Sequence, residues 1–218
     1  MNKLLVIIIL SLILTGCGTD EAQPTVEIVL GDVIYENSFD DPNSWETFGL
    51  IDTQFGISNG EYTAISAGGG YIPVTNGVSH SNVVMEVTAE QFAGNNDTIY
   101  GIMCRTHPRL TSIGYYFLIN SSGSYGIRIG ETDRIRMFVP WTEHPAINEG
   151  LATNTIRAVC VDDYFALYIN EQFVAEARQD WLVEGNMGLV ISSPNGIDVA
   201  VKFDDVTIWD ATIIEPEE

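Results

Sequence analysis

Basic residues are scarce in this sequence. Only 9 lysines and arginines accompany 30 aspartates and glutamates among 218 residues, and the formal net charge is −21. A field of that sign repels phosphate backbones and anionic lipid headgroups. The composition therefore argues against a nucleic-acid partner and against direct docking on anionic lipid. It suits solubility outside the cell, and it also suits the binding of divalent cations.

Histidine is scarce as well, and the residue patterns of common hydrolases are absent. The three histidines, His80, His107 and His144, lie in loop-like contexts with no nucleophile elbow nearby. His107 and His144 each precede a proline, which indicates the start of a turn. Closely spaced Cys and His ligands for zinc are also missing. The sequence therefore favours neither Ser-His-Asp chemistry nor a zinc site.

Long apolar runs are absent except at the N-terminus. After Lys3, residues 4–14 are apolar apart from Ser11, which is typical of a cleaved signal peptide and too short to span a bilayer core of about 30 Å. Residues 14–17 read Leu-Thr-Gly-Cys and resemble the lipobox of bacterial lipoproteins, whose cysteine becomes the new N-terminus and carries lipid. We expect a signal peptide over residues 1–17 with a lipidated Cys17, anchored in the cell envelope outside the cytoplasm. The alternative is an ordinary secretory signal with an unrelated cysteine.

The rest of the chain is long enough for one domain. Residues 18–25 are mostly polar and contain Pro24, and we expect residues 18–32 to form a polar tether that holds the domain off the membrane. Residues 33–210 are expected to form a single domain, which is an ordinary size for a β-sandwich. Residues 211–218 form an acidic tail.

Cysteines are few, and only three are present. If Cys17 carries lipid, Cys104 and Cys160 remain in a compartment that does not reduce thiols, where an even number of cysteines favours pairing. We predict one disulfide between them. The alternative is a pair of buried free thiols that act as small apolar side chains.

Helical periodicity does not extend beyond a turn or two, and apolar residues instead alternate with a period of two. Within residues 82–91, Val83 and Val87 alternate with Glu86 and Thr88, as in a strand with one buried and one wet face. The expected strands cover residues 33–39, 61–65, 70–74, 82–91, 98–106, 113–120, 125–129, 154–161, 164–169, 173–177, 187–192 and 199–209. Residues 130–150 show no such alternation, and no strand is expected there. Short strands with frequent turn signals predict an all-β, antiparallel two-sheet sandwich.

Several motifs along these strands carry a resemblance. They are Phe39-Asp40-Asp41-Pro42 with Trp45, Tyr100 to Arg105, Tyr115 to Ile119, Asn154 to Arg157, Leu167 to Asn170, Gly188 to Val190, and Phe203 to Val206. Their order resembles the concanavalin A-like lectin/glucanase superfamily, and more closely its laminin-G-like and keto-disaccharide-hydrolase-like jelly rolls. The resemblance implies a jelly-roll fold. It also implies that the two cysteine-bearing strands come close enough to bridge.

The β-glucanases of this superfamily use two glutamates on one strand with an aspartate between them. The nearest counterpart here is Glu86-Val87-Thr88-Ala89-Glu90, in which Thr88 replaces the aspartate. Without that group nothing obvious tunes the ionisation of a nucleophile, so we expect no enzymatic activity. A glycoside hydrolase of the jelly-roll type is one alternative.

Sugar binding is the function that we expect. The resemblance implies a concave sheet on which aromatic rings can stack against sugars, and the candidates are Tyr115, Tyr125, Trp141 and Tyr168. Strand aromatics also commonly belong to the core. The other alternative is a structural or adhesion module that binds an envelope protein.

Calcium is the one cofactor to consider. The terminal strands of a jelly roll are often neighbours, so Asp40, Asp41, Asp204 and Asp205 could converge and supply the oxygen ligands that Ca²⁺ takes. The alternative is that these Asp-Asp pairs are turn formers at strand ends.

Overall fold

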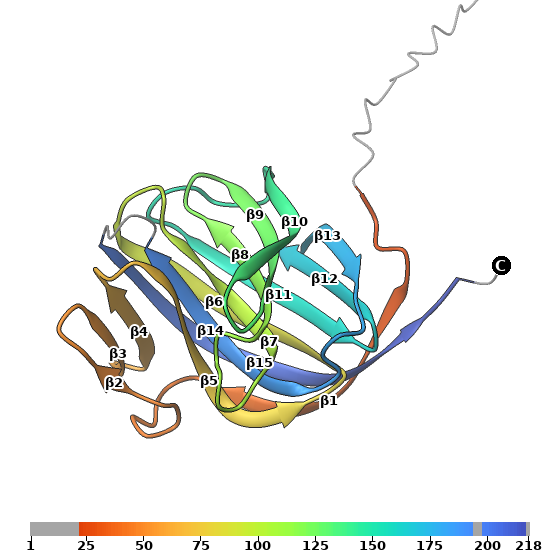
Figure 1. Cartoon of the computed structure of the whole chain (residues 1–218), viewed down its shortest axis with the longest axis horizontal. Helices are drawn as coiled ribbons and strands as arrows, with labels where there is room; N and C mark the ends of the chain where they lie inside the picture. Colours follow the sequence, from red (N-terminus) through yellow and green to blue (C-terminus); the bar gives the residue numbers. More distant parts are fainter. Residues whose placement is uncertain (1–21, 194–197, 217–218) are drawn as a thin grey trace, which may run out of the picture.

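The computed structural model describes residues 22–193 and 198–216, and the predicted signal peptide with Cys17 lies outside this range. All regular elements of the described residues are strands, arranged as two antiparallel sheets that face each other (Figure 1). None of these residues forms a helix that is long and apolar enough to span a bilayer. The predicted all-β sandwich is confirmed.

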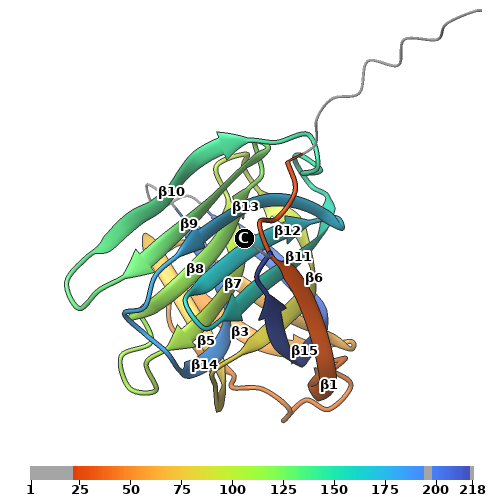
Figure 2. The same ribbon diagram turned by 90° about the vertical axis from the view of Figure 1, so that its right-hand side faces the viewer.

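The larger sheet has nine strands. Its order is β13-β12-β11-β6-β15-β4-β3-β2, and β1 pairs with β15 (Figure 2). The strands are β1 (Glu27–Asn37), β2 (Phe48–Gly49), β3 (Thr53–Ser58), β4 (Glu61–Ser66), β6 (Val83–Gly94), β11 (Thr153–Val161), β12 (Tyr164–Ile169), β13 (Gln172–Arg178) and β15 (Val199–Ile214).

The smaller sheet has six strands in the order β10-β9-β8-β7-β14-β5. These are β5 (Gly70–His80), β7 (Ile99–Thr106), β8 (Gly114–Asn120), β9 (Ser124–Gly130), β10 (Ile135–Glu143) and β14 (Gly185–Ser193).

Alternating residues build the core between the sheets. On β6, Met85, Val87 and Ala89 are fully buried in the main core, while the alternating residues Glu86 and Glu90 are partly exposed on the outer face. Such alternation follows from the pleat of a strand, whose successive side chains point to opposite faces. The outer face of β6 is therefore free to carry polar chemistry.

The predicted disulfide is confirmed. Cys104 on β7 and Cys160 on β11 are bonded, with their Cα atoms 6.8 Å apart. Since β7 belongs to the smaller sheet and β11 to the larger one, the bond crosses the core and joins the two layers.

Three strands, β2, β3 and β10, lie where none was expected, and β2 has only two residues, too few for any alternation. β10 lies within the expected loose stretch of residues 130–150. The sequence does not reveal it, because it is an edge strand that has no regular burial pattern and contains Pro140. β3 was also missed, and it forms a hairpin with β4 through the turn Asn59-Gly60, where both residues have positive φ.

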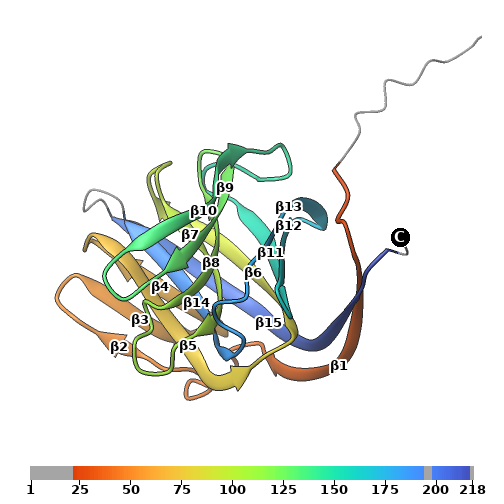
Figure 3. The same ribbon diagram turned by 45° about the vertical axis from the view of Figure 1, so that its right-hand side comes forward.

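The boundaries of the sheet also differ from the expectation. β1 begins at Glu27, inside the stretch expected to be tether, and β15 continues to Ile214, beyond the predicted end at residue 210. The two strands pair there as a ribbon that curls past the outer face of β11 and β12 (Figure 3), where Ala211 is buried in a cluster with Val159. The side chains of β1 are mostly exposed, so no alternation of buried and exposed residues reveals this strand.

Candidate functional site

The outer face of the nine-stranded sheet is polar around β15. In the strand register, Lys202 of β15 lies opposite Glu90 of β6 on one side and opposite Thr63 of β4 on the other. The neighbouring residues Val201 and Phe203 are fully buried in the core, so Lys202 points to the outer face. β15 therefore carries charged side chains along the middle of an open sheet face.

A hollow of about 380 Å³ lies on this face, and we call it the central hollow. Its walls come from β3, β4, β6 and β15. They consist of Gln54, Gly56, Ile57, Ser58, Asn59, Glu61, Thr63, Ile65, Phe92 and Lys202.

Lys202 organises the chemistry of the central hollow. Its Nζ lies 3.0 Å from Glu61 Oε2 and over one face of the Phe92 ring, 5.4 Å from the ring centre, so the opposite face is the one left for a ligand. The hydrogen bond to Glu61 raises the pKa of Lys202 above its ordinary value, so the ammonium group stays charged. The hollow thus presents an aromatic ring beside an ammonium and a carboxylate group, with the amide of Gln54 and the hydroxyl of Thr63 in the same wall.

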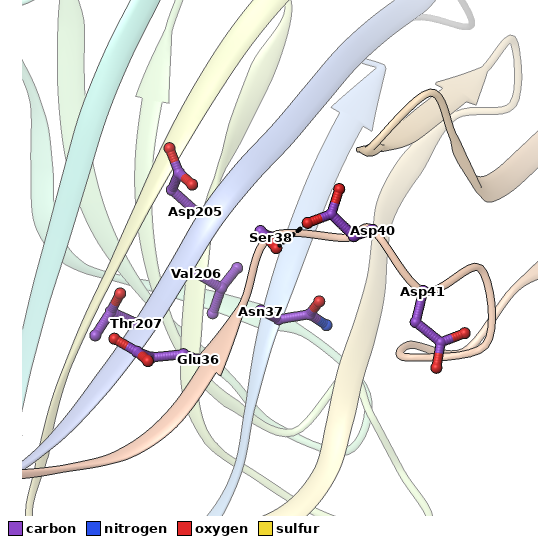
Figure 4. Close-up of a pocket in the computed structure, with 8 residues that line it drawn as sticks. All are labelled: Glu36, Asn37, Ser38, Asp40, Asp41, Asp205, Val206 and Thr207. Carbon is purple, nitrogen blue, oxygen red and sulfur yellow. Dashed lines mark hydrogen bonds between the residues drawn. The ribbon is translucent and has the colours of Figure 1, made fainter.

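A second hollow of about 440 Å³ lies where β1 meets β15, and we call it the acidic hollow (Figure 4). It is lined by Glu36, Asn37, Ser38, Asp40, Asp41, Asp205, Val206 and Thr207. Asn37 shapes the loop beside it. Its Oδ1 accepts hydrogen bonds from the Phe39 N–H at 2.8 Å and the Ser44 hydroxyl at 3.1 Å, and its amide donates to the Tyr35 hydroxyl at 3.0 Å.

The predicted calcium ligands gather only in part. Asp40, Asp41 and Asp205 line the acidic hollow, but the carboxylate of Asp41 points away from the other two (Figure 4). Asp41 Oδ1 instead accepts the Asn43 N–H at 2.9 Å, as a turn former does. In residues 22–193 and 198–216, no group of three or more His, Cys, Asp or Glu side chains could hold a metal ion. The four aspartates do not form the expected coordination set.

Asp204 stands between the two hollows. Its burial raises its pKa, and the backbone N–H of Asp205, 2.8 Å away, works in the opposite direction. The negative charges of Asp205, Glu61 and Asp40 raise the pKa of Asp204 further. Negative charge from both hollows therefore acts on Asp204, and an anionic ligand bound there would meet the same repulsion.

The four aromatic residues predicted to bind a ligand do not form one platform. Tyr115 is fully buried and Tyr125 is 7% exposed, and the Tyr115 ring lies 4.2 Å from that of Phe165 in the core. The prediction that these two tyrosines contact a ligand is therefore wrong. Trp141 packs under Arg128 of the six-stranded sheet, and Tyr168 packs against Phe173 on the nine-stranded sheet. The alternation along a strand assigns each of these residues to one of its two faces, but it does not tell which of the two faces meets the core.

Phe92 was missed. It lies on β6, two residues beyond Glu90, on the same wet face as Glu86. Extending the expected strand past Gln91 by one residue would have placed it there. The expected strand over residues 82–91 stops one residue short of Phe92, although the alternation of outer-face residues continues to it.

Glu86 and Glu90 of β6 both lie on the outer face, and Glu86 forms an ion pair with Arg157 of β11. Glu86 Oε2 lies 2.6 Å from Arg157 Nη2 and 2.7 Å from Arg157 Nε. Thr88, between the two glutamates on the strand, pairs with Asp204 of β15. A carboxylate is therefore present opposite Thr88, although it comes from another strand.

The histidines expected to start turns do so. His107 Nδ1 accepts the backbone N–H of Leu110 at 3.1 Å, and His144 Nδ1 accepts that of Ala146 at 3.2 Å. These roles are structural.

No protein-family model matches the sequence, and no curated protein matches it. Solved structures match its fold. The carbohydrate-binding module CBM66 from Bacillus subtilis has a TM-score of 0.55 at 18% identity, over 78% of this chain and 97% of that one. The catalytic domain of an endo-1,3-beta-glucanase (laminarinase) from Thermotoga petrophila RKU-1 has a TM-score of 0.57 at 8% identity, over 83% and 98%. The carbohydrate recognition domain of Emp47p has a TM-score of 0.54 at 12% identity, over 81% and 95%.

Identities this low establish the fold alone. The chain is an antiparallel two-sheet jelly-roll sandwich, an architecture that it shares with a carbohydrate-binding module and with a glucanase.

Proposed function

We propose that this protein is a non-catalytic carbohydrate-binding module that holds its ligand at the central hollow. The observation that carries the proposal is the Phe92 ring, set in a hollow of about 380 Å³ beside Lys202 and Glu61. The fold supports it, because CBM66 and the Emp47p domain have the same architecture.

Sugar rings have the complementary chemistry. One face of a sugar ring carries C–H groups that pack on an aromatic ring, and its rim carries hydroxyls that both donate and accept hydrogen bonds. Lys202 supplies donors only and Glu61 acceptors only, whereas the Gln54 amide supplies both. These groups around one ring are what a sugar requires.

The absence of catalysis is part of the proposal. The carboxylate of Glu86 is held by Arg157, and Thr88 stands where the glucanases place an aspartate. Hydrolysis with retention needs two carboxyl groups about 5–5.5 Å apart with different ionisation. We infer that Glu86 holds β6 to β11 through Arg157, and that Glu90 is a polar side chain on the outer face of β6.

We also propose that the protein works outside the cytoplasm on a lipid anchor at Cys17. The leader pattern of residues 1–17 supports this location. The disulfide between Cys104 and Cys160 supports it independently, since such bonds persist in oxidising compartments.

Substitution of Phe92 tests the binding site. In Phe92→Ala the stacking surface is lost, so affinity for a bound oligosaccharide should fall by about tenfold or more, which is ~1.4 kcal/mol or more. Calorimetric titration of the wild type and the variant measures this. The control is Trp181→Ala, which removes an exposed aromatic residue outside the hollow and should leave affinity unchanged. Equal binding by the Phe92 variant would contradict the proposed site.

A glucanase is the second candidate, because Asp204 lies opposite Thr88 and could replace the missing aspartate. The chain also has the fold of the Thermotoga laminarinase. Release of reducing ends from laminarin and mixed-linkage glucan discriminates the two functions. We expect none from the wild type, whereas activity that disappears in Glu86→Gln and in Glu90→Gln would establish a hydrolase.

A further inference from the structure

A third hollow, of about 500 Å³, continues the outer face of the nine-stranded sheet past the central hollow, and we call it the end hollow. It is lined by Gly49, Leu50, Ile51, Asp52, Thr53, Gln54, Ile65, Ser66, Ala67 and Asp198. Gln54 and Ile65 also line the central hollow, so the two hollows share a wall.

The three hollows follow one stretch of the chain. Asp198, directly before β15, lines the end hollow, Lys202 lines the central hollow, and Asp205 lines the acidic hollow. At about 3.3 Å per residue, this stretch covers about 20 Å. The hollows therefore form a row that runs with the strand direction and is longer than one sugar ring.

The acidic and central hollows are also neighbours. A Cβ atom added to Gly60 would lie 3.5 Å from Asp40 Oδ1, which places the acidic loop against the β3–β4 turn. Asn59 and Glu61, on either side of Gly60, line the central hollow. A ligand in the central hollow can thus continue in both directions.

Apolar contacts are spaced along the row. Phe92 lies in the central hollow, and the loop tip at the end hollow carries Leu50, which is 74% exposed, and Ile51, which is fully exposed. Exposed apolar side chains beside a polar hollow are suited to the C–H faces of further sugar units.

The charge along the row is mainly negative. Asp52 and Asp198 line the end hollow and four acidic residues line the acidic hollow, whereas Lys202 is the one basic side chain among the described residues that line the three hollows. Since Glu61 already pairs with Lys202, little positive charge is left for an anionic polymer.

We propose that the ligand is a linear, non-anionic polysaccharide, bound by an internal segment of several consecutive units that lies along β15. This inference rests on the proposed function. It goes further in that it names the class of sugar, the direction of the chain, and contacts at Leu50 and Ile51 that a single sugar unit in the central hollow does not reach.

The length dependence of binding tests the proposal. Neutral cello-, laminari- and manno-oligosaccharides from disaccharide to hexasaccharide are titrated by calorimetry, and in the series that binds we expect affinity to rise by about tenfold or more with length. The double variant Leu50→Ser/Ile51→Ser should lose this gain for the hexasaccharide and bind the disaccharide as the wild type does. The matched control is Leu151→Ser, which changes an exposed leucine outside the three hollows and should have no effect.

The outcomes separate the two proposals. Equal affinity for disaccharide and hexasaccharide, or an unaffected double variant, overturns the extended site and leaves sugar binding in place. Equally tight binding of oligogalacturonates overturns the non-anionic class. If no oligosaccharide of any length or charge binds, the proposed function fails and this inference fails with it.

Discussion

Arg105 is a cation with only 1% of its surface exposed. Its Nη1 donates to the carbonyl oxygens of Asp162 at 2.7 Å and Leu182 at 2.8 Å, and its Nη2 donates to that of Ser81 at 3.1 Å. The guanidinium also lies over the ring of Phe165. Burial lowers the pKa of Arg105, but a guanidinium stays charged far above neutral pH. One side chain therefore ties together three segments that are distant in the sequence.

Loss of this side chain should be costly. We expect Arg105→Ala to lower the free energy of unfolding by about 3–5 kcal/mol, because three carbonyl groups lose a charged donor and a cavity forms beside Phe165. Urea denaturation measures the change. Arg136→Ala, which removes an exposed guanidinium paired with Glu131, is the control and should cost less than about 1 kcal/mol. Similar values for both variants would contradict the role of Arg105.

At the scale of elements, the segments near both ends of the described range are fastened to β13. The N-terminal segment passes over the outer face of the nine-stranded sheet (Figure 2), where Val26 packs in a small cluster with Val84 and Val159. The N–H of Thr25 donates to Glu176 Oε2 at 2.9 Å. Near the C-terminal limit of the described range, Arg178 Nη2 lies 2.7 Å from Glu215 Oε1. These contacts cover the part of the sheet face away from the central hollow.

The contact at Glu176 predicts a dependence on pH. Burial would raise the pKa of Glu176, but hydrogen bonds from Thr25 and Tyr164 outweigh it, and the pKa is lowered. A folded-state pKa below the unfolded one stabilises the fold above the unfolded value, and this stabilisation is lost as pH falls through the folded value. Glu176→Gln should therefore cost stability at pH 7, by no more than about 1 kcal/mol because solvent screens the site, and nothing in acid.

Urea midpoints of the wild type and Glu176→Gln, at neutral pH and near pH 3, measure this difference. The exposed Glu143→Gln serves as the control and should match the wild type at both values. A difference that is constant with pH, or larger in acid, would show that Glu176 does not act through its charge.

At the scale of the whole molecule, the disulfide is the one covalent link between the layers that the described residues contain. Cys104 and Cys160 are separated by 56 residues in the sequence, and closing a loop of that size stabilises the fold by about 4 kcal/mol through the lost entropy of the unfolded chain. The double variant Cys104→Ala/Cys160→Ala should lose about 3–5 kcal/mol. Urea denaturation with and without a reducing agent checks this, because a reductant should weaken the wild type and leave the variant unchanged.

Much of the fold is predictable from local pattern. The alternation of Val83 and Val87 with Glu86 and Thr88 indicates a strand with a buried and a wet face, because side-chain direction along a strand depends only on its pleat. The pairing of the two remaining cysteines followed from their number and the inferred compartment. The edge strand β10 and the first half of β1 are not predicted, because exposed side chains on both faces leave no alternation to detect.

The candidate site was predicted far less well, and the reason is physical. Which face of a strand meets the core depends on the sheet opposite, so Tyr115 lies inside while Phe92 lies outside. Strand order and register decide which residues are neighbours across strands. They place Lys202 beside Glu61, and they leave the carboxylates of Asp40, Asp41 and Asp205 too scattered to bind one ion together. Alternation is a local property that the order of residues carries, whereas the row of hollows along β15 exists only once distant strands have paired.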